Sequence, residues 1–176
     1  AMGVGLHPRT SDYPIWAGEG FAEYITALRH LYGDWIAFGE RGAVVHELSL
    51  ARQDQVDLEG LRLVTRPAVH SAGALHLRFE AEGAAIVFSG DTGPSEQLAQ
   101  LASGADLLVC ECAFPDEAPE EGHLTPSAVA TIVDAAKPRE VWLTHLYPMV
   151  DPALAVATVA KTGVPVRRAA DLDRWP

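Results

Sequence analysis

The spacing of hydrophobic residues changes along the chain. In the first half, apolar and polar residues mostly alternate with the two-residue period of half-buried strands. This pattern predicts strands over 13–16, 43–50 and 61–69, and a hairpin of two strands over 74–89. Pro67 cannot donate a ladder hydrogen bond, so it is expected near a strand end. Residues 19–32 instead carry apolar side chains at helical spacing, and Gly33 is expected to end that helix.

After Gly90 the pattern alternates between short buried strands and helices. The predicted helices are 94–103, 125–136 and 151–161, and the predicted strands are 106–112, 141–146 and 164–169. Thr125 followed by Pro126 is a typical helix start, because threonine caps the helix and proline suits its first position. A hairpin followed by alternating strands and helices indicates an α/β layered fold. No repeat or linker interrupts it, so residues 1–176 are expected to form a single domain.

The composition allows a substantial core, since 48% of the 176 residues are apolar. No apolar run approaches the roughly 18 residues of a membrane helix, and no signal peptide is visible, so a cytoplasmic protein is expected. Cys110 and Cys112 are two apart on a predicted strand and therefore share a face. Such a pair rarely forms a disulfide, and we expect two small buried residues in a reducing compartment.

The charge argues against a large nucleic-acid substrate. The formal net charge is −11, from 13 Lys and Arg against 24 Asp and Glu. An anionic chain does not attract a phosphate backbone by its overall field. The dense basic spots, 62–66 and 167–168, are expected to be ordinary surface charge.

Four polar residues lie at or just after predicted strands, where sites form in α/β folds. Asp91 follows the strand that ends at Ser89, His70 and His145 close strands, and His123 precedes the helix at Thr125. Three imidazoles and a carboxylate are plausible ligands for zinc or a similar ion. Each has an alternative interpretation: a histidine at a strand end is more often a structural residue, and Gly-Asp is usually a turn.

The remaining histidines carry no comparable signal. His76 lies on the polar side of an alternating strand and is expected to face solvent. His30 lies near a helix C-terminus, where a cation is mildly favourable. His7 and His46 have no informative spacing.

Four ordered blocks carry a family resemblance. They are AAIVFSGDTGPSEQL, ADLLVCECAF, GHLTPSAVATIV and VWLTHLYP, and PAVHSAGALHLRFEAEG precedes them. Together they resemble the C-terminal half of metallo-β-lactamase-fold hydrolases, in particular the ribonuclease Z-like and cyclic-nucleotide phosphodiesterase-like group. The resemblance covers about residues 64–170, with a weaker similarity over 13–32. It implies a partial αββα sandwich, mainly the C-terminal β-sheet and its helices.

The resemblance also implies roles for single residues. His70 would bind a first metal ion, Asp91 would bridge two ions, and His145 would bind the second. His123 would donate a proton to the leaving oxygen, and Glu111 would orient His123. The alternative for Glu111 is an acid at a strand end that faces water.

Thr92 and Thr144 would contact the metal ligands, not the metal ions, and stabilise the positions of those ligands. The complete enzyme would use two divalent ions, zinc or possibly manganese.

One defining motif of the family, His-x-His-x-Asp-His, is absent. Ahead of His70 there are only His7, His30 and His46, and no two of them are close. We therefore expect an N-terminally truncated domain whose metal occupancy is doubtful. An exposed sheet face would be covered by a second copy, as a homo-oligomer, or by the missing N-terminal part.

The resemblance implies a fragment of a dinuclear-metal hydrolase. The expected substrate is a small phosphodiester, attacked by a metal-bound hydroxide, although lactones, thioesters and β-lactams are cleaved at the same kind of site. Alone, the chain is expected to be weakly active or inactive. The alternative from another class is a degenerate, non-catalytic domain that serves interaction or dimerisation.

Overall fold

The computed structural model describes residues 12–36 and 43–175, and the chain divides into two compact units, 1–50 and 51–176. In the first unit, strands β1 (Tyr13–Gly18) and β2 (Ala43–Leu48) pair in parallel. Helix α2 (Phe21–Tyr32) follows β1 and continues into the 3-10 helix η1 (Gly33–Ile36). The Glu47 carboxylate accepts hydrogen bonds from the amides of Gly20 and Ala22, at 2.9 and 3.0 Å, and so stabilises the start of α2.

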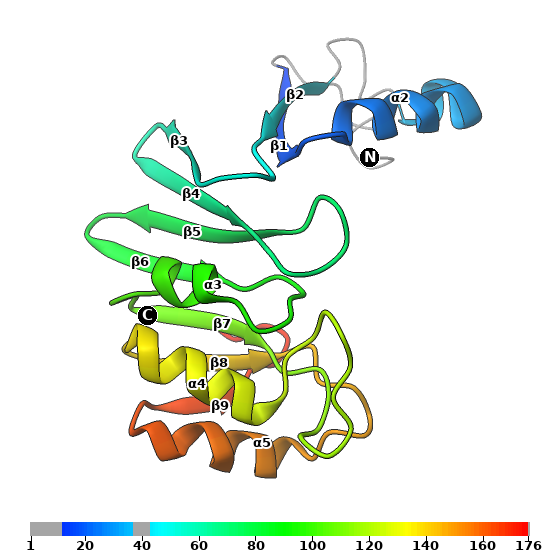
Figure 1. The fold of residues 1–176 in the computed structure, drawn as a ribbon. Helices are drawn as coiled ribbons and strands as arrows, with labels where there is room; N and C mark the ends of the chain where they lie inside the picture. The colour runs from blue at the N-terminus through cyan, green and yellow to red at the C-terminus, as the bar shows by residue number, and fades with distance from the viewer. Residues whose placement is uncertain (1–11, 37–42, 176) are drawn as a thin grey trace. The chain divides into compact units, whose positions relative to one another are not determined.

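Residues 51–175 form a seven-stranded sheet in which the strands follow chain order (Figure 1). Strands β3 (Asp54–Leu58), β4 (Leu61–Pro67), β5 (Leu75–Ala81) and β6 (Ala84–Phe88) form an antiparallel meander. Strands β7 (Leu107–Glu111), β8 (Val141–Thr144) and β9 (Val166–Arg168) continue it in parallel with β6. The parallel strands are connected through helices α3 (Glu96–Leu101), α4 (Pro126–Ala136) and α5 (Pro152–Val159), with the 3-10 helix η2 (Ala160–Thr162) after α5.

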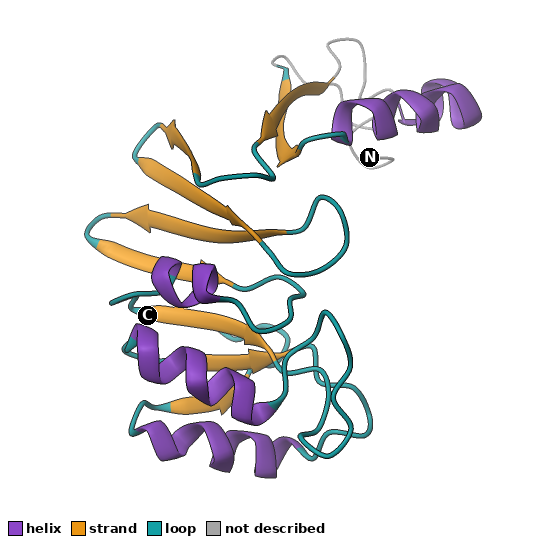
Figure 2. Cartoon of the chain, in the orientation of Figure 1, coloured by secondary structure: helices purple, strands orange, loops and turns teal. Residues whose placement is uncertain are grey.

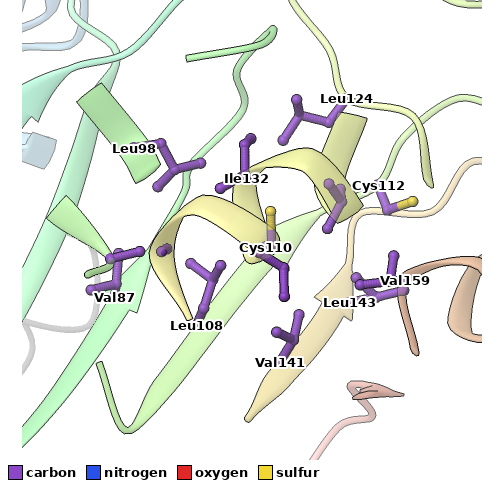
Figure 3. Close-up of a cluster of buried hydrophobic side chains, with 14 of the residues drawn as sticks. Val87, Leu98, Leu108, Cys110, Cys112, Leu124, Ile132, Val141, Leu143 and Val159 are labelled. Atoms are coloured by element: carbon purple, nitrogen blue, oxygen red, sulfur yellow. The ribbon is translucent and has the colours of Figure 1, made fainter. Parts of the chain in front are cut away.

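The three helices cover one face of this sheet, as expected for right-handed crossovers that all proceed in the same direction (Figure 2). Side chains from strands and helices meet there in one apolar cluster (Figure 3). Its fully buried members are Val87, Leu98, Ala102, Ala105, Leu108, Cys110, Cys112, Leu124, Val129, Val133, Val141, Leu143 and Val159. The core therefore lies between the parallel strands and the helices, and it fixes the loops at the strand ends.

Cys110 and Cys112 are free and buried, which confirms that they fill core space. Burial raises the pKa of both thiols, to about 12 for Cys112. Both thiols are therefore held in their neutral form at neutral pH.

The opposite face of the antiparallel strands is less covered. Phe79 and Phe88 meet edge to face there, with ring centroids 6.0 Å apart, and Phe88 is 39% exposed. Leu77, the cross-strand neighbour of Phe88, and Ile86, the neighbour of Phe79, are partly exposed as well. These four residues, Leu77, Phe79, Ile86 and Phe88, form the open face of the sheet.

The structure corrects two expectations. Strand β3 was not predicted, because Asp54, Gln55 and Asp57 make it too polar for the hydrophobic pattern. The prediction that His76 faces solvent is wrong: its side chain is completely buried. The reason is that the His76 side of β5 packs toward α3, where Ser95 contacts the imidazole.

The observed helices are shorter than the predicted ones, since α3 begins at Glu96 and α5 ends at Val159. Over 12–36 and 43–175, none of the helices is both long and apolar enough to span a membrane.

Candidate active site

The candidate residues lie at one edge of the sheet. Strands β4, β6, β7 and β8 run in the same direction, so the chain leaves all of them at this edge, on the right in Figure 1. His70 follows β4, Asp91 follows β6, Glu111 ends β7 and His145 follows β8. His123 lies in the loop between β7 and α4. The fold therefore brings together residues that are far apart in the sequence.

Three imidazoles and a carboxylate form a compact group. The ring centroids of His70 and His123 are 5.0 Å apart, and those of His123 and His145 are 5.7 Å apart with nearly parallel rings. Nε2 of His145 lies 3.8 Å from Oδ2 of Asp91. His123 thus stands between the two other histidines, and Asp91 lies beside His145.

Glu111 is the buried centre of the hydrogen bonding around this group, with a side chain that is 1% exposed. Its Oε1 accepts from the amide of Thr92 at 2.7 Å and lies 3.0 Å from Nδ1 of His123. Its Oε2 accepts from the amides of Ala113 and Leu124, at 3.2 and 3.1 Å. The alternative that Glu111 faces water is therefore wrong.

The tautomer of His123 follows from this arrangement. A carboxylate only accepts hydrogen bonds, so Nδ1 of His123 must carry the proton that it shares with Glu111. The other ring nitrogen, Nε2, is therefore the one that can exchange a proton with a substrate. An acid that accepts from one ring nitrogen in this way fixes the tautomer and the orientation of the imidazole.

Thr92 joins the loop of Asp91 to the loop of His70. Its Oγ1 accepts from the amide of Val69 at 3.1 Å and donates to the carbonyl of Gly93 at 2.9 Å. The amide of Gly93 in turn donates to the carbonyl of Val69 at 2.8 Å. These bonds hold together the residues that adjoin His70 and Asp91. For Thr144 the supporting contact is a backbone one: its carbonyl accepts from the amide of Cys112 at 3.0 Å.

The backbone is unusual at His145, where φ is +53°. A non-glycine residue adopts this left-handed conformation at some energetic cost, and such residues are enriched at functional sites. The turn changes the direction of the chain, and so of the imidazole, immediately after β8. It therefore sets where the ring stands relative to Asp91.

Two aromatic residues that the sequence did not single out border the imidazoles. The ring of Phe114 lies 5.4 Å from that of His123, and the ring of Tyr147 lies 5.3 Å from that of His145. The two aromatic rings are 5.0 Å apart, and Tyr147 is 41% exposed. The sequence could have indicated them only by their positions, because each lies a few residues after a candidate residue in one of the four blocks that carry the resemblance.

A hollow of about 280 Å³ adjoins His145 and is lined by Thr144, Leu146, Arg168 and Asp171, among others. Arg168 is exposed there at the end of β9. Arg167 behaves as ordinary surface charge, because it lies over the Trp142 ring and pairs with Asp173 at 2.7 Å. Arg168 is the cation that lines the hollow beside His145.

His70, Asp91 and His145 have the donor types that bind zinc or manganese. Across the described parts of the chain, however, no three His, Cys, Asp or Glu side chains converge closely enough to hold one ion. Nδ1 of His70 lies 3.0 Å from the hydroxyl of Ser71 instead. The described residues provide part of a ligand set and do not complete one.

The sequence profile of the family described as "Beta-lactamase superfamily domain" matches residues 5–146, which include all five candidate residues. The chain belongs to the β-lactamase superfamily. Within it, the chain is similar to ribonuclease Z of Brevibacillus brevis, with 38% identity over 104 residues, which cover 57% of this chain and 30% of that protein. An uncharacterised protein of Mycobacterium leprae is 36% identical over 99 residues, which cover 54% of this chain and 34% of that protein.

Solved structures confirm the fold. The metallo-β-lactamase fold protein YhfI of Bacillus subtilis superposes with a TM-score of 0.74 at 16% identity, covering 89% of this chain and 61% of that one. The short form of human tRNase Z gives 0.73 at 20% identity, covering 98% and 70%. The expected metallo-β-lactamase fold is thereby confirmed, and the sequence similarity to ribonuclease Z agrees with the resemblance. The match spans about a third of the length of the first curated relatives.

Members of this superfamily use divalent metal ions, and one structural neighbour, PqqB from Methylobacterium extorquens, is a Zn²⁺-bound protein.

Proposed function

We propose that this superfamily member provides half of the active site of a metal-dependent phosphodiesterase that acts on a small phosphodiester. One observation carries the proposal: buried Glu111 holds Nδ1 of His123, and His123 stands between His70 and His145. An imidazole oriented through one nitrogen and open at the other is suited to general acid catalysis.

His123 would act on the leaving group. In its doubly protonated form it donates the Nε2 proton to the leaving oxygen as the phosphorus–oxygen bond breaks. It then holds the neutral Nδ1–H tautomer that Glu111 favours, and takes up a proton again before the next cycle. The attacking oxygen comes from water, and its proton passes to solvent, so the step is balanced.

The metal ligands that are absent among residues 12–36 and 43–175 would come from elsewhere. We infer that His70, Asp91 and His145 would hold divalent ions together with ligands from another segment of the complete protein or from a second copy of the chain. The open face of the sheet supports this inference, because Phe88 is 39% exposed and its neighbours are partly exposed. The same second segment would cover that face.

The charge favours a small substrate. A net charge of −11 repels a long phosphate backbone, whereas a single phosphodiester needs only a local cation. Arg168 lines the hollow beside His145 and is such a cation. The aromatic rings of Phe114 and Tyr147 would contact a planar leaving group.

The test is hydrolysis of bis(p-nitrophenyl) phosphate by the full chain with added manganese or zinc. We expect slow turnover that rises with the ion and disappears in the Asp91→Ala variant. In His123→Ala we expect a loss of about 10²-fold or more, which matches the usual contribution of a general acid. The absence of hydrolysis with either ion, with the chain folded, would contradict catalysis by this chain alone.

A second candidate function is a non-catalytic interaction module, and the lack of three converging ligands among the described residues favours it. That function predicts a stable dimer by light scattering, no bound ion after dialysis and no hydrolysis. A monomer that binds ions and turns over substrate would exclude it.

A further inference from the structure

His76 is a buried histidine with two partners, and neither belongs to the proposed reaction. Its side chain on β5 is completely buried. Nδ1 lies 2.6 Å from the carbonyl oxygen of Ser89, and Nε2 lies 3.1 Å from Oγ of Ser95. A carbonyl only accepts, so Nδ1 must carry the proton, and Nε2 of the neutral ring accepts from the Ser95 hydroxyl.

These two partners stand at the two ends of the segment that carries Asp91. Ser89 follows the last residue of β6, and Ser95 is the N-cap of α3, where its Oγ also accepts from the amide of Leu98 at 3.2 Å. The imidazole of His76 therefore spans the base of the loop formed by residues 90–94. Fixing both ends of a loop reduces the conformations open to the residues between them.

The loop also packs against the strand of His76. Gly90 has φ +60°, and a Cβ added to it would lie 3.1 Å from the carbonyl oxygen of Leu75, the residue before His76. The turn before Asp91 is therefore close to the β5 backbone, and glycine is required there.

Ser89 extends this network toward Glu111. Its hydroxyl donates to the carbonyl of Gly90 at 2.7 Å and accepts from the amide of Glu111 at 2.9 Å. One residue thus receives the His76 hydrogen bond on its carbonyl and supports the Glu111 backbone with its side chain.

We propose that His76 is a positioning residue that fixes the Asp91 loop and, through Ser89, the backbone of Glu111. It does not touch substrate. Its importance for catalysis rests on the proposed function, because that function assigns the chemistry to Asp91, Glu111 and His123. The hydrogen bonds by which His76 fixes the Asp91 loop do not depend on that chemistry.

The decisive measurement is amide hydrogen exchange, because it separates a local effect from a global one. The local reporters are the amides of Thr92 and Gly93, which donate to Glu111 Oε1 and to the Val69 carbonyl. The global reporters are the amides of Val129 and Lys137 in and at the end of α4. In His76→Leu we expect Thr92 and Gly93 to lose about tenfold more protection than the α4 amides.

A pair of polar variants keeps the test independent of whether His76→Leu folds. His76→Asn retains a donor near the position of Nδ1, whereas His76→Gln presents its amide near the position of Nε2. We expect asparagine to preserve the protection of Thr92 better than glutamine does. Equal loss in both variants, or equal loss at Thr92 and in α4, would overturn the proposal.

Hydrolysis of bis(p-nitrophenyl) phosphate provides the second measurement. If the parent chain is active, kcat should fall in the same order as Thr92 protection, while KM changes little. If the parent chain is inactive, catalysis by this chain alone fails, and the exchange data still decide whether His76 fixes the loop.

Discussion

A methyl group added to Gly122 would lie 3.2 Å from Cδ2 of the His70 imidazole. Gly122 also has φ +81°, a conformation that other residues rarely adopt. Position 122 therefore has two requirements that only glycine meets: a left-handed backbone and a close approach to an imidazole of the candidate site.

Gly122→Ala should displace the His70 ring in addition to destabilising the fold. The backbone cost is about 1–2 kcal/mol for a left-handed alanine. Gly163 is a matched control, because its φ is +80° and a Cβ there meets nothing within 4 Å. We expect both variants to lose similar stability in urea unfolding. The His70 ring resonances in NMR spectra should shift only in Gly122→Ala, and unchanged His70 resonances would show that the loop yields without moving the ring.

Glu111→Gln should be strongly destabilising although it changes a single atom. Three backbone amides donate to the Glu111 carboxylate, at 2.7, 3.2 and 3.1 Å, and an amide NH₂ would face at least one of them or Nδ1 of His123. A buried donor that faces another donor costs about 1–3 kcal/mol or more. Urea unfolding measures the loss.

The exposed Glu117 provides the control for the charge, and Glu117→Gln should change stability by less than about 0.5 kcal/mol. ¹⁵N spectra should also show which end of the side-chain amide in Glu111→Gln faces His123, because only an oxygen there keeps the Nδ1–H tautomer. Equal stability of the two variants would contradict the role given to the Glu111 carboxylate.

The sequence predicted most of the α/β unit, because buried parallel strands and their capped helices leave strong local patterns. It also indicated His70, Asp91 and His145, since each follows a strand whose end lies at one edge of the sheet. It could not predict which face of β5 is buried. Both faces alternate plausibly, and only the position of α3 decides that His76 is inside.

Other features depend on contacts that no local pattern encodes. The polar strand β3 forms because its backbone pairs with β4. Hydrophobic periodicity does not indicate backbone pairing of this kind. Tyr147 lies in a loop, so its place beside His145 follows from the left-handed turn at His145 and not from spacing. The contacts of Glu111 with three backbone amides likewise required the folded loops.

Tyr147→Ala should weaken binding of an aryl phosphodiester. The exposed Tyr147 ring contacts Phe114 and His145, and an aromatic contact of this kind contributes about 0.5–1.5 kcal/mol. We expect KM for bis(p-nitrophenyl) phosphate to rise roughly threefold to tenfold, with kcat nearly unchanged. Tyr147→Phe keeps the ring and should retain the parent KM. A fall in kcat without a change in KM would place Tyr147 in the chemical step instead.

Arg168→Gln should reduce affinity for an anionic substrate through the loss of one cation beside His145. Arg139 is the control: it is 82% exposed, pairs with Asp106 and precedes β8, at the opposite edge of the sheet. Both substitutions change the net charge equally. KM should rise only in Arg168→Gln, and the difference should shrink as salt screens the interaction. Equal KM values in the two variants at low salt would show that Arg168 does not contribute to substrate binding.

The stability of the chain should decrease below about pH 6.5 in part because of His76. Burial lowers the pKa of His76 from its ordinary value of 6.5, against a smaller opposing effect of the Ser89 hydrogen bond. Below pH 6.5 the unfolded chain binds a proton at this position that the folded chain does not, so acidification favours unfolding. The contribution is fully present above pH 6.5 and is lost as the pH falls toward the lowered value. Arg66 on β4 is the cross-strand neighbour of His76 on β5. A cation in that position does not stabilise a protonated His76 ring.

Urea unfolding at pH 7.5 and 5.0 tests this, with His76→Asn as the comparison. All other ionisable groups are the same in both proteins, so the difference between the two pH dependences isolates His76. We expect the parent to lose more stability on acidification than His76→Asn does. If the two proteins lose the same amount, burial does not hold the His76 ring neutral, and Nε2 would donate to the Ser95 hydroxyl instead of accepting from it.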